Sequence, residues 1–247
     1  MSFIAAALIG IVLGVLVNLL ADHLPHHRRP GAPLCAHCEE PFPLPFWLAA
    51  MRFTAAKGKC PNCQQRGALR PLLVELTLMA VIPLIWLQQR PDLLLTLHYS
   101  LFAFILLLLL VTDLEHRLIP HAITLPAIAI FLVLDIFTIG FYIGAVGAVT
   151  GLVLFLIFYL VGARFFGPGA LGFGDVTLAT LIGASLGFPA VFVALVIGIL
   201  LGGIIPLLLV VARLRTMKSY VPYGPFLIAG AVIVYVWGEQ IIQSYLN

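Results

Sequence analysis

The chain has 247 residues, 62% of them hydrophobic and only 9% charged, and its formal net charge is +3. Soluble domains contain roughly 45–50% apolar and about 25% charged residues, so this composition excludes a soluble globular protein. We expect a lipid bilayer to cover the chain, and we expect no nucleic acid among its partners. The composition predicts an all-α fold, a polytopic bundle of membrane helices.

Eight apolar runs follow one another along the chain. Each is a candidate membrane helix, because a hydrocarbon core of about 30 Å needs roughly 20 residues of helix. The sixth run is short, so we expect it to be tilted or partly buried by its neighbours. The runs lie at residues 3–21, 72–88, 93–113, 122–139, 143–163, 175–187, 189–211 and 224–246.

A polar segment with several prolines interrupts this pattern after the first run. The sequence therefore predicts three parts: a first transmembrane helix at 1–21, an insert at 22–71 and a seven-helix membrane domain at 72–247. No positive charge precedes the first run and several follow it, which favours a retained helix over a cleaved signal peptide.

Lysine and arginine are distributed unevenly among the loops. If all eight runs cross the membrane, every lysine and arginine except Arg90 lies on the same side. Positively charged residues collect in cytoplasmic loops, so we expect this side to face the cytoplasm. The insert at 22–71 is then cytoplasmic, and both chain termini lie outside.

The insert contains all four cysteines of the chain in two C-x-x-C pairs, Cys35 with Cys38 and Cys60 with Cys63. Two such pairs can supply the four thiolates of a tetrahedral zinc site. A reducing compartment disfavours disulfides, and a polar insert of this size has too small a core to fold without a staple. We therefore predict structural zinc, with two redox pairs or unligated thiols as the alternatives. Because the protein would supply all four ligands, we do not expect this ion to act in catalysis.

Two aspartates stand out because they lie at the ends of apolar runs at the same predicted depth. Asp113 lies at the cytoplasmic end of the third run, and Asp175 opens the sixth. Packed helix axes lie about 8–10 Å apart, so neighbouring helices can bring the two carboxylates together. Two close carboxylates share a proton and can act on one water as base and acid, which predicts amide hydrolysis without a metal. The alternative for Asp175 is an interfacial acid that caps a helix.

Gly172 and Gly174 flank Phe173 immediately before Asp175. Without side chains, their backbone can adopt unusual φ and ψ angles and let an extended peptide lie close to the aspartate. Non-helical backbone is tolerated at membrane depth where it lines a cavity. We therefore expect both glycines to contact a substrate.

Several short motifs together resemble one family. Residues 172–175 match the G-x-G-D motif of membrane aspartyl proteases, and residues 113–120, DLEHRLIP, resemble the first-aspartate motif of the type IV prepilin leader peptidases. The first-helix segment GVLVNLLADHLP, the paired cysteines, PLLVEL and VPYGPFL follow that family's order along nearly the whole chain. G-x-G-D alone is a weak signal, whereas the ordered set is specific.

This resemblance implies an enzyme of the bacterial inner membrane that removes the leader peptide from type IV prepilins or pseudopilins on the cytoplasmic side. It implies catalytic roles for Asp113 and Asp175, and it places Pro120, from the Leu-x-Pro element, beside the substrate. Many family members also N-methylate the new terminus, so the resemblance implies S-adenosylmethionine as the methyl donor for that second activity.

Three positions differ from the family pattern. His23, His121 and Thr177 stand where an arginine, an acid and a lysine are usual. None of them replaces an aspartate, so they bear on substrate preference and methylation more than on proteolysis.

A membrane transporter or channel is the alternative function, because buried acids also carry protons or cations. Transporters place such acids near the membrane midplane and often show inverted repeats. Here both aspartates are predicted at one face of the membrane, and no internal repeat is evident. These features favour the enzyme.

Overall fold

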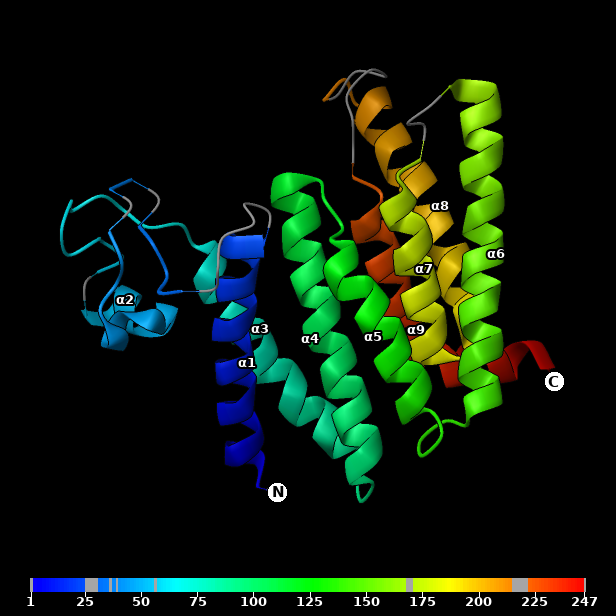
Figure 1. Cartoon of the computed structure of the whole chain (residues 1–247), viewed down its shortest axis with the longest axis horizontal. Coiled ribbons are helices and arrows are strands. Elements are labelled where there is room, and N and C mark those ends of the chain that lie inside the picture. The colour runs from blue at the N-terminus through cyan, green and yellow to red at the C-terminus, as the bar shows by residue number, and fades with distance from the viewer. Residues whose placement is uncertain are drawn as a thin grey trace. The chain divides into compact units, whose positions relative to one another are not determined.

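The computed structural model describes residues 2–24, 31–35, 37–38, 40–55, 57–167, 171–214 and 222–246. Within these residues every extended regular element is a helix (Figure 1). The elements are, in chain order, α1 (Phe3–His23), η2 (Leu44–Trp47), α2 (Ala49–Ala55), α3 (Arg70–Gln88), α4 (Leu93–His116), α5 (His121–Leu134), α6 (Phe141–Phe166), α7 (Phe173–Leu186), α8 (Ala190–Val211) and α9 (Gly224–Leu246).

The apolar helices correspond to the eight runs predicted from hydropathy. Five of them, α1, α3, α4, α6 and α8, are long and apolar enough to cross a membrane. Three shorter apolar helices, at His121–Leu134, Phe173–Leu186 and Gly224–Gly238, account for the remaining runs. The all-α bundle expected from the composition is confirmed.

Helix α5 is shorter than the run predicted at 122–139. It ends at Leu134, and the following residues up to 139 form turns. Gly140 has a φ of 98° and donates its N–H to the carbonyl of Asp135 at 2.8 Å, which closes this segment. Such a φ favours glycine, so the turn that follows the helix closes at Gly140. Hydropathy does not indicate this turn, because the residues from 135 to 139 are mostly apolar.

The chain divides into two compact units, residues 1–111 and 112–247. Helix α4 contributes most of its length to the first unit and its last turn to the second. The division predicted from composition, at 1–21, 22–71 and 72–247, stays a prediction.

Within the first unit, α1 and α3 cross closely at two glycines of α1. A Cβ on Gly10 would collide with the carbonyl of Leu78, and a Cβ on Gly14 would lie 2.7 Å from Cα of Glu75. Small residues permit this close approach between membrane helices. Helix α3 also contacts α2 of the cysteine insert.

Within the second unit, α7 lies among α5, α6, α8 and α9 (Figure 1). All its residues from Asp175 to Ser185 are buried, as expected for a short run enclosed by neighbours. Helix α6 approaches α7 at Gly147 and Gly183, where a Cβ on either glycine would collide with the carbonyl of the other. The helix that carries Asp175 is therefore held by tight helix packing.

Candidate active site and metal centre

Asp113 lies in the last turn of α4, inside the second unit. It is 5% exposed, and its Oδ2 has no hydrogen-bond partner among the residues that the structure describes. Arg117, with a φ of 54°, donates its N–H to the carbonyl of Asp113 at 2.9 Å just after the helix ends. The buried carboxylate therefore stands where the chain turns from α4 towards α5.

Asp175 is the third residue of α7, and Gly172 is the N-cap of that helix. The N–H of Asp175 donates to the carbonyl of Gly172 at 3.1 Å, and a Cβ on Gly172 would lie 3.4 Å from Oδ2 of Asp175. Asp175 is 6% exposed. A Cβ on Gly174, the residue before it, would lie 2.9 Å from Cβ of Ile119. Ile119 also lies beside Gly224, which packs against the Asp113 carboxylate. The second unit thus brings together two buried carboxylates that are far apart in the sequence.

Tyr223, just before α9, is a third polar group near this pair. Its ring packs against Phe155 and Phe226, with centroids 6.3 Å apart in both cases. Burial and, secondly, the charge of Asp175 raise the pKa of this phenol. Tyr223 belongs to the motif VPYGPFL, and the sequence alone does not place this motif near the aspartates.

The two glycines of the G-x-G-D motif have ordinary backbone angles, contrary to the expectation from the sequence. Gly172 has φ −75° and ψ 139°, and neither glycine has a positive φ. The need for glycine at 174 is steric, because a Cβ there would lie 2.9 Å from Cβ of Ile119. Gly172 is exposed, and within the part of the chain that the structure describes a Cβ there would meet Asp175 and the backbone of Gly174. Pro120, beside Ile119, is the partly exposed N-cap of α5.

The four cysteines gather at one point in the first unit. Sγ of Cys35 lies 3.8 Å from Sγ of Cys63, Sγ of Cys38 lies 3.9 Å from Sγ of Cys60, and all four atoms lie within 4.8 Å of one another. A tetrahedral zinc ion with Zn–S bonds of about 2.3 Å separates its sulfurs by about 3.8 Å. Bonded disulfide sulfurs lie about 2.05 Å apart, so these are free thiols whose spacing fits zinc.

Each cysteine pair lies in a tight turn. The N–H of Cys35 donates to the carbonyl of Glu40 at 3.0 Å, and the N–H of Cys60 donates to the carbonyl of Gln65 at 2.9 Å. A single antiparallel bridge flanks each turn. The side chains packed against the cysteines are aromatic, namely Phe42, Phe46 and Trp47.

In the pair of Cys35 and Cys38, the surroundings favour a thiolate at Cys35. Burial alone would raise the pKa of Cys35, but hydrogen bonds from the backbone of His37 and Cys38 and from the thiols of Cys38 and Cys60 lower it to about 6. The backbone of Glu40 favours a thiolate at Cys38, yet desolvation and the neighbouring cysteines raise the pKa of Cys38 to about 12. Further thiolates therefore repel the first, and a dication at their centre would offset this repulsion.

Two family models match the chain. Residues 100–207 match the "Type IV leader peptidase family", and residues 8–89 match the "Bacterial Peptidase A24 N-terminal domain". The first match contains both aspartates, and the second contains all four cysteines. The chain belongs to the type IV leader peptidase family. Because five of its helices are long and apolar enough to cross a membrane, this leader peptidase is a multi-pass inner-membrane protein.

Curated relatives of this leader peptidase are similar over most of its length. It is 28% identical over 219 residues to the prepilin leader peptidase/N-methyltransferase of Aeromonas salmonicida (strain A449), covering 86% of this chain and 74% of the relative. The chain is 27% identical over 272 residues to the prepilin leader peptidase/N-methyltransferase of Pseudomonas putida, covering 98% of this chain and 93% of the relative. The chain is also 26% identical over 246 residues to the prepilin leader peptidase/N-methyltransferase of Bacillus subtilis (strain 168), covering 96% of this chain and 95% of the relative. No solved structure matches the chain.

Two of the positions at which the chain departs from the leader peptidase pattern contact each other. Oγ1 of Thr177 lies 3.4 Å from Nδ1 of His121, accepts a hydrogen bond from Oγ1 of Thr124 at 3.3 Å, and donates to the carbonyl of Gly174 at 2.9 Å. His121 also packs edge-on against Phe173, with ring centroids 5.7 Å apart. These two side chains therefore lie together beside the first turn of α7.

Glu75 of α3 is a buried acid whose partners the sequence does not reveal. It is 2% exposed and accepts the N–H of Ala49 at 2.8 Å and that of Ala50 at 3.3 Å. These alanines begin α2, so Glu75 anchors the cysteine insert to α3. Burial lowers the pKa of Arg52 in α2, and the charge of Glu75 opposes this shift. A single acid in an apolar run is the signal that marks such a residue.

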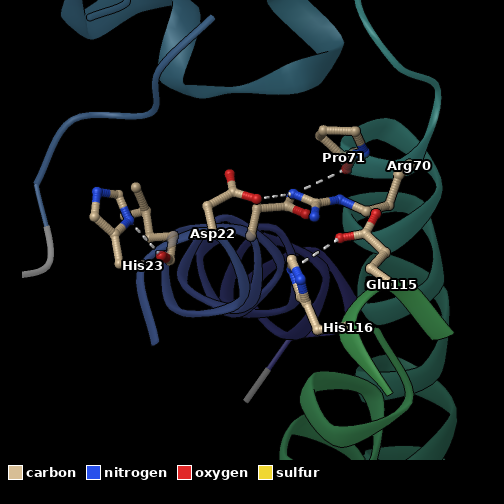
Figure 2. A network of polar contacts seen from close by, with 8 residues as sticks. Asp22, His23, Arg70, Pro71, Glu115 and His116 are labelled. Atoms are coloured by element: carbon tan, nitrogen blue, oxygen red, sulfur yellow. Dashed lines mark hydrogen bonds and ion pairs between the residues drawn. The ribbon is translucent and has the colours of Figure 1, made fainter. Parts of the chain in front are cut away.

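A second set of polar contacts joins the two ends of the insert. Nη2 of Arg70 lies 2.6 Å from Oδ1 of Asp22, and Figure 2 shows the two side chains pointing towards each other. Nδ2 of Asn18 donates to the carbonyl of Pro71 at 3.1 Å. His23, the third departure from the family pattern, is buried, and its Nδ1 lies 2.7 Å from a carbonyl one turn earlier in α1. The insert thus leaves and re-enters the helix pair at neighbouring points.

Proposed function

We propose that the chain is an aspartyl endopeptidase of the bacterial inner membrane that removes the leader peptide from type IV prepilins or pseudopilins. The names of its relatives supply the substrate class. The distribution of lysine and arginine among the loops favours a site on the cytoplasmic side. The observation that carries the proposal is that two buried carboxylates, Asp113 and Asp175, lie within one unit near the same side chain, Ile119. They are the proposed catalytic pair.

The pair would hydrolyse a peptide bond by sharing one proton, with one carboxylate ionised and the other protonated. The ionised carboxylate takes a proton from water, and the water oxygen attacks the carbonyl carbon of the scissile bond. The protonated carboxyl gives its proton to the carbonyl oxygen, which yields a gem-diol. As the C–N bond breaks, the first carboxyl gives its proton to nitrogen and a gem-diol hydroxyl returns a proton to the second. The products are a carboxylic acid and an amine.

Gly172, Gly174 and Pro120 are the proposed substrate contacts. Gly172 is exposed beside Asp175, and among the described residues a Cβ there would meet only Asp175 and the backbone of Gly174. An extended peptide can lie there with a carbonyl group near the carboxylates. Gly174 supports this arrangement because it lets α7 pack against Ile119, the neighbour of Pro120.

Zinc is the proposed ion of the cysteine centre, where it would hold the insert together, and the Sγ spacing supports it. The relatives are named as N-methyltransferases, so we include methylation of the new amino terminus, with S-adenosylmethionine as the donor. In this proposal the bilayer surrounds the apolar helices and both chain termini lie outside.

Mass spectrometry of a candidate prepilin co-expressed with the chain tests the function. The wild-type chain should remove the leader, and any added methyl group appears in the same spectrum. Asp113→Asn and Asp175→Asn keep the side-chain size, and each should lower cleavage by about 100- to 10,000-fold because base and acid catalysis are lost.

The matched control is Asp92→Asn. Asp92 is an exposed acid that accepts the N–H groups of Leu94 and Leu95 at the start of α4. Asparagine caps helices about as well as aspartate, so this variant should cleave normally. Normal processing by either active-site variant contradicts the proposal. If ion flux into liposomes falls when Asp113 or Asp175 is neutralised, and no peptide product forms, the result would support a transporter instead.

A further inference from the structure

The start of α9 is a part of the second unit to which the proposed reaction assigns no role. The motif VPYGPFL covers residues 221–227, and α9 begins at its glycine, Gly224. Gly224 is buried, and the N–H of Phe226 donates to the carbonyl of Tyr223 at 3.1 Å in the first turn. Pro225 follows at a position where its missing N–H costs no helical hydrogen bond.

Gly224 lies directly against the carboxylate of Asp113. A Cβ on Gly224 would lie 2.5 Å from Oδ2 and 3.2 Å from Cγ of Asp113, and 3.5 Å from Cδ1 of Ile119. Because a Cβ does not come within 3.0 Å of heavy atoms of residues it is not bonded to, any side chain at this position forces the carboxylate to move. Asp113 is nine-tenths buried, and its Oδ2 has no hydrogen-bond partner in the described part of the chain. This oxygen faces the backbone at the start of α9.

Gly174 makes a similar approach at the start of α7. A Cβ on Gly174 would lie 2.9 Å from Cβ of Ile119, so Ile119 contacts both glycines. The first turns of α7 and α9 therefore both pack against Ile119. Helix α7 carries Asp175, and the start of α9 contacts Asp113. The N-terminal ends of helices also favour nearby negative charge.

We propose that Gly224 is a positioning residue for Asp113: its missing side chain lets the start of α9 fix the direction of the Asp113 carboxylate towards the shared water. This inference rests on the proposed peptidase function. A misplacement of about 1 Å in an active site can cost about 100-fold in rate, so a contact this close has a measurable consequence. Gly224 acts through Asp113 and itself touches no reacting atom.

The substitution Gly224→Ala tests the positioning role in the prepilin cleavage assay. We expect kcat to fall by about 100-fold while KM stays within about twofold, because substrate contacts are kept and the carboxylate is displaced. Alanine favours helix over glycine, so a weaker helix cannot explain a loss. The control is Gly203→Ala in α8. Gly203 is exposed, and a Cβ there would meet no described residue within 4 Å, so its kcat should equal that of the wild type. Wild-type kcat in Gly224→Ala overturns the proposal.

A second control on the same helix separates positioning from packing. A Cβ on Gly230 of α9 would collide with the carbonyl of Ala194 in α8, away from the aspartates. Gly230→Ala should therefore lower Tm while the folded fraction keeps its kcat. If Gly224→Ala behaves in the same way, with Tm lowered and kcat per folded molecule kept, Gly224 is a packing residue and the proposal is overturned.

A double variant keeps the test decisive if Gly224→Ala folds poorly. Because the collision is with the Asp113 carboxylate, Asp113→Ala should restore the Tm that Gly224→Ala loses, and the two changes should be non-additive. Additive losses overturn the inference. This measurement of Tm needs no substrate, so it tests the contact of Gly224 with Asp113 independently of catalysis. If the wild-type chain cleaves no prepilin, that result rejects the proposed function and leaves the Tm test unaffected.

Discussion

The cysteine centre of the first unit and the aspartate pair of the second are both built from side chains far apart in the sequence, but the chain holds them differently. Each C-x-x-C turn presents two thiols by its own local geometry, so only two turns have to meet. The aspartates come one from each of two helices, and the starts of α7 and α9 close around them through glycines. Local spacing specifies the metal centre, whereas helix packing specifies the carboxylate pair.

The two regions also differ in what supplies their stability. The cysteine insert has short helices and a small aromatic core around the thiols. A bound ion would therefore contribute much of its folding free energy. Helix α7 is buried along almost its whole length, so the aspartate region depends on close contact between helices. The two regions should consequently fail under different substitutions.

Removing one cysteine should have the largest effect. Cys60→Ser leaves three thiolates for the ion, and structural zinc contributes about 10–16 kcal/mol of apparent binding free energy in small domains. We expect bound zinc to fall from about one equivalent to nearly none, and the insert to become sensitive to proteases. Metal analysis of the purified protein and limited proteolysis measure the two effects.

The control for this substitution is His37→Ala. His37 is an exposed potential ligand beside Cys38, and it is not part of the cluster of four sulfurs. Its removal should leave the zinc content unchanged. Full zinc retention by Cys60→Ser, or an insert that resists proteases without metal, contradicts the account of the metal centre.

Much of this architecture could be predicted from the sequence, for identifiable reasons. The eight helices follow from hydropathy, because lipid-facing and buried residues are both apolar. The gathering of the thiols follows from the spacing of Cys35 and Cys38 and of Cys60 and Cys63. The juxtaposition of Asp113 with Asp175 is predicted from their matching depth, although depth alone does not make two helices neighbours.

The rest could not be predicted, because it depends on contacts between distant segments. The sequence suggests that Gly174 is needed for backbone freedom, whereas the structure shows a steric reason, its close contact with Ile119. Glu75 has its partners in α2, which the hydropathy of α3 does not indicate. The contact of His121 with Thr177 joins two differences that look independent along the chain.

Enlarging a glycine at the crossing of α6 and α7 tests the helix-packing side of the comparison, with a smaller effect. A Cβ on Gly183 would collide with the carbonyl of Gly147, and backbone cannot swing aside as a flexible side chain can. Overpacking of this kind costs about 1–3 kcal/mol, so Gly183→Ala should lower Tm and reduce prepilin cleavage while zinc content stays unchanged. Gly203→Ala is the control and should alter none of these. An unchanged Tm in Gly183→Ala would show that the crossing is not tight.

The smallest effect is expected where Glu75 of α3 holds the start of α2 in the insert. Glu75→Gln keeps one oxygen that can accept the N–H of Ala49, but it removes the charge and the second acceptor for Ala50. Because a hydrogen bond to a charged group contributes about 1.5–3 kcal/mol and a neutral one about 1 kcal/mol, weakening the bond to Ala49 should cost about 1 kcal/mol. Losing the longer bond to Ala50, at 3.3 Å, should add a smaller cost. Amide hydrogen exchange of residues 49–55 should accelerate accordingly, with zinc still bound.

Glu40→Gln is the matched change for this last substitution, since Glu40 is an exposed glutamate of the same insert. It should leave the exchange of residues 49–55 as in the wild type. If Glu75→Gln also leaves it unchanged, Glu75 does not anchor α2. If it instead releases the zinc, the insert depends on its anchor as much as on its thiols, and local spacing alone does not account for the metal centre.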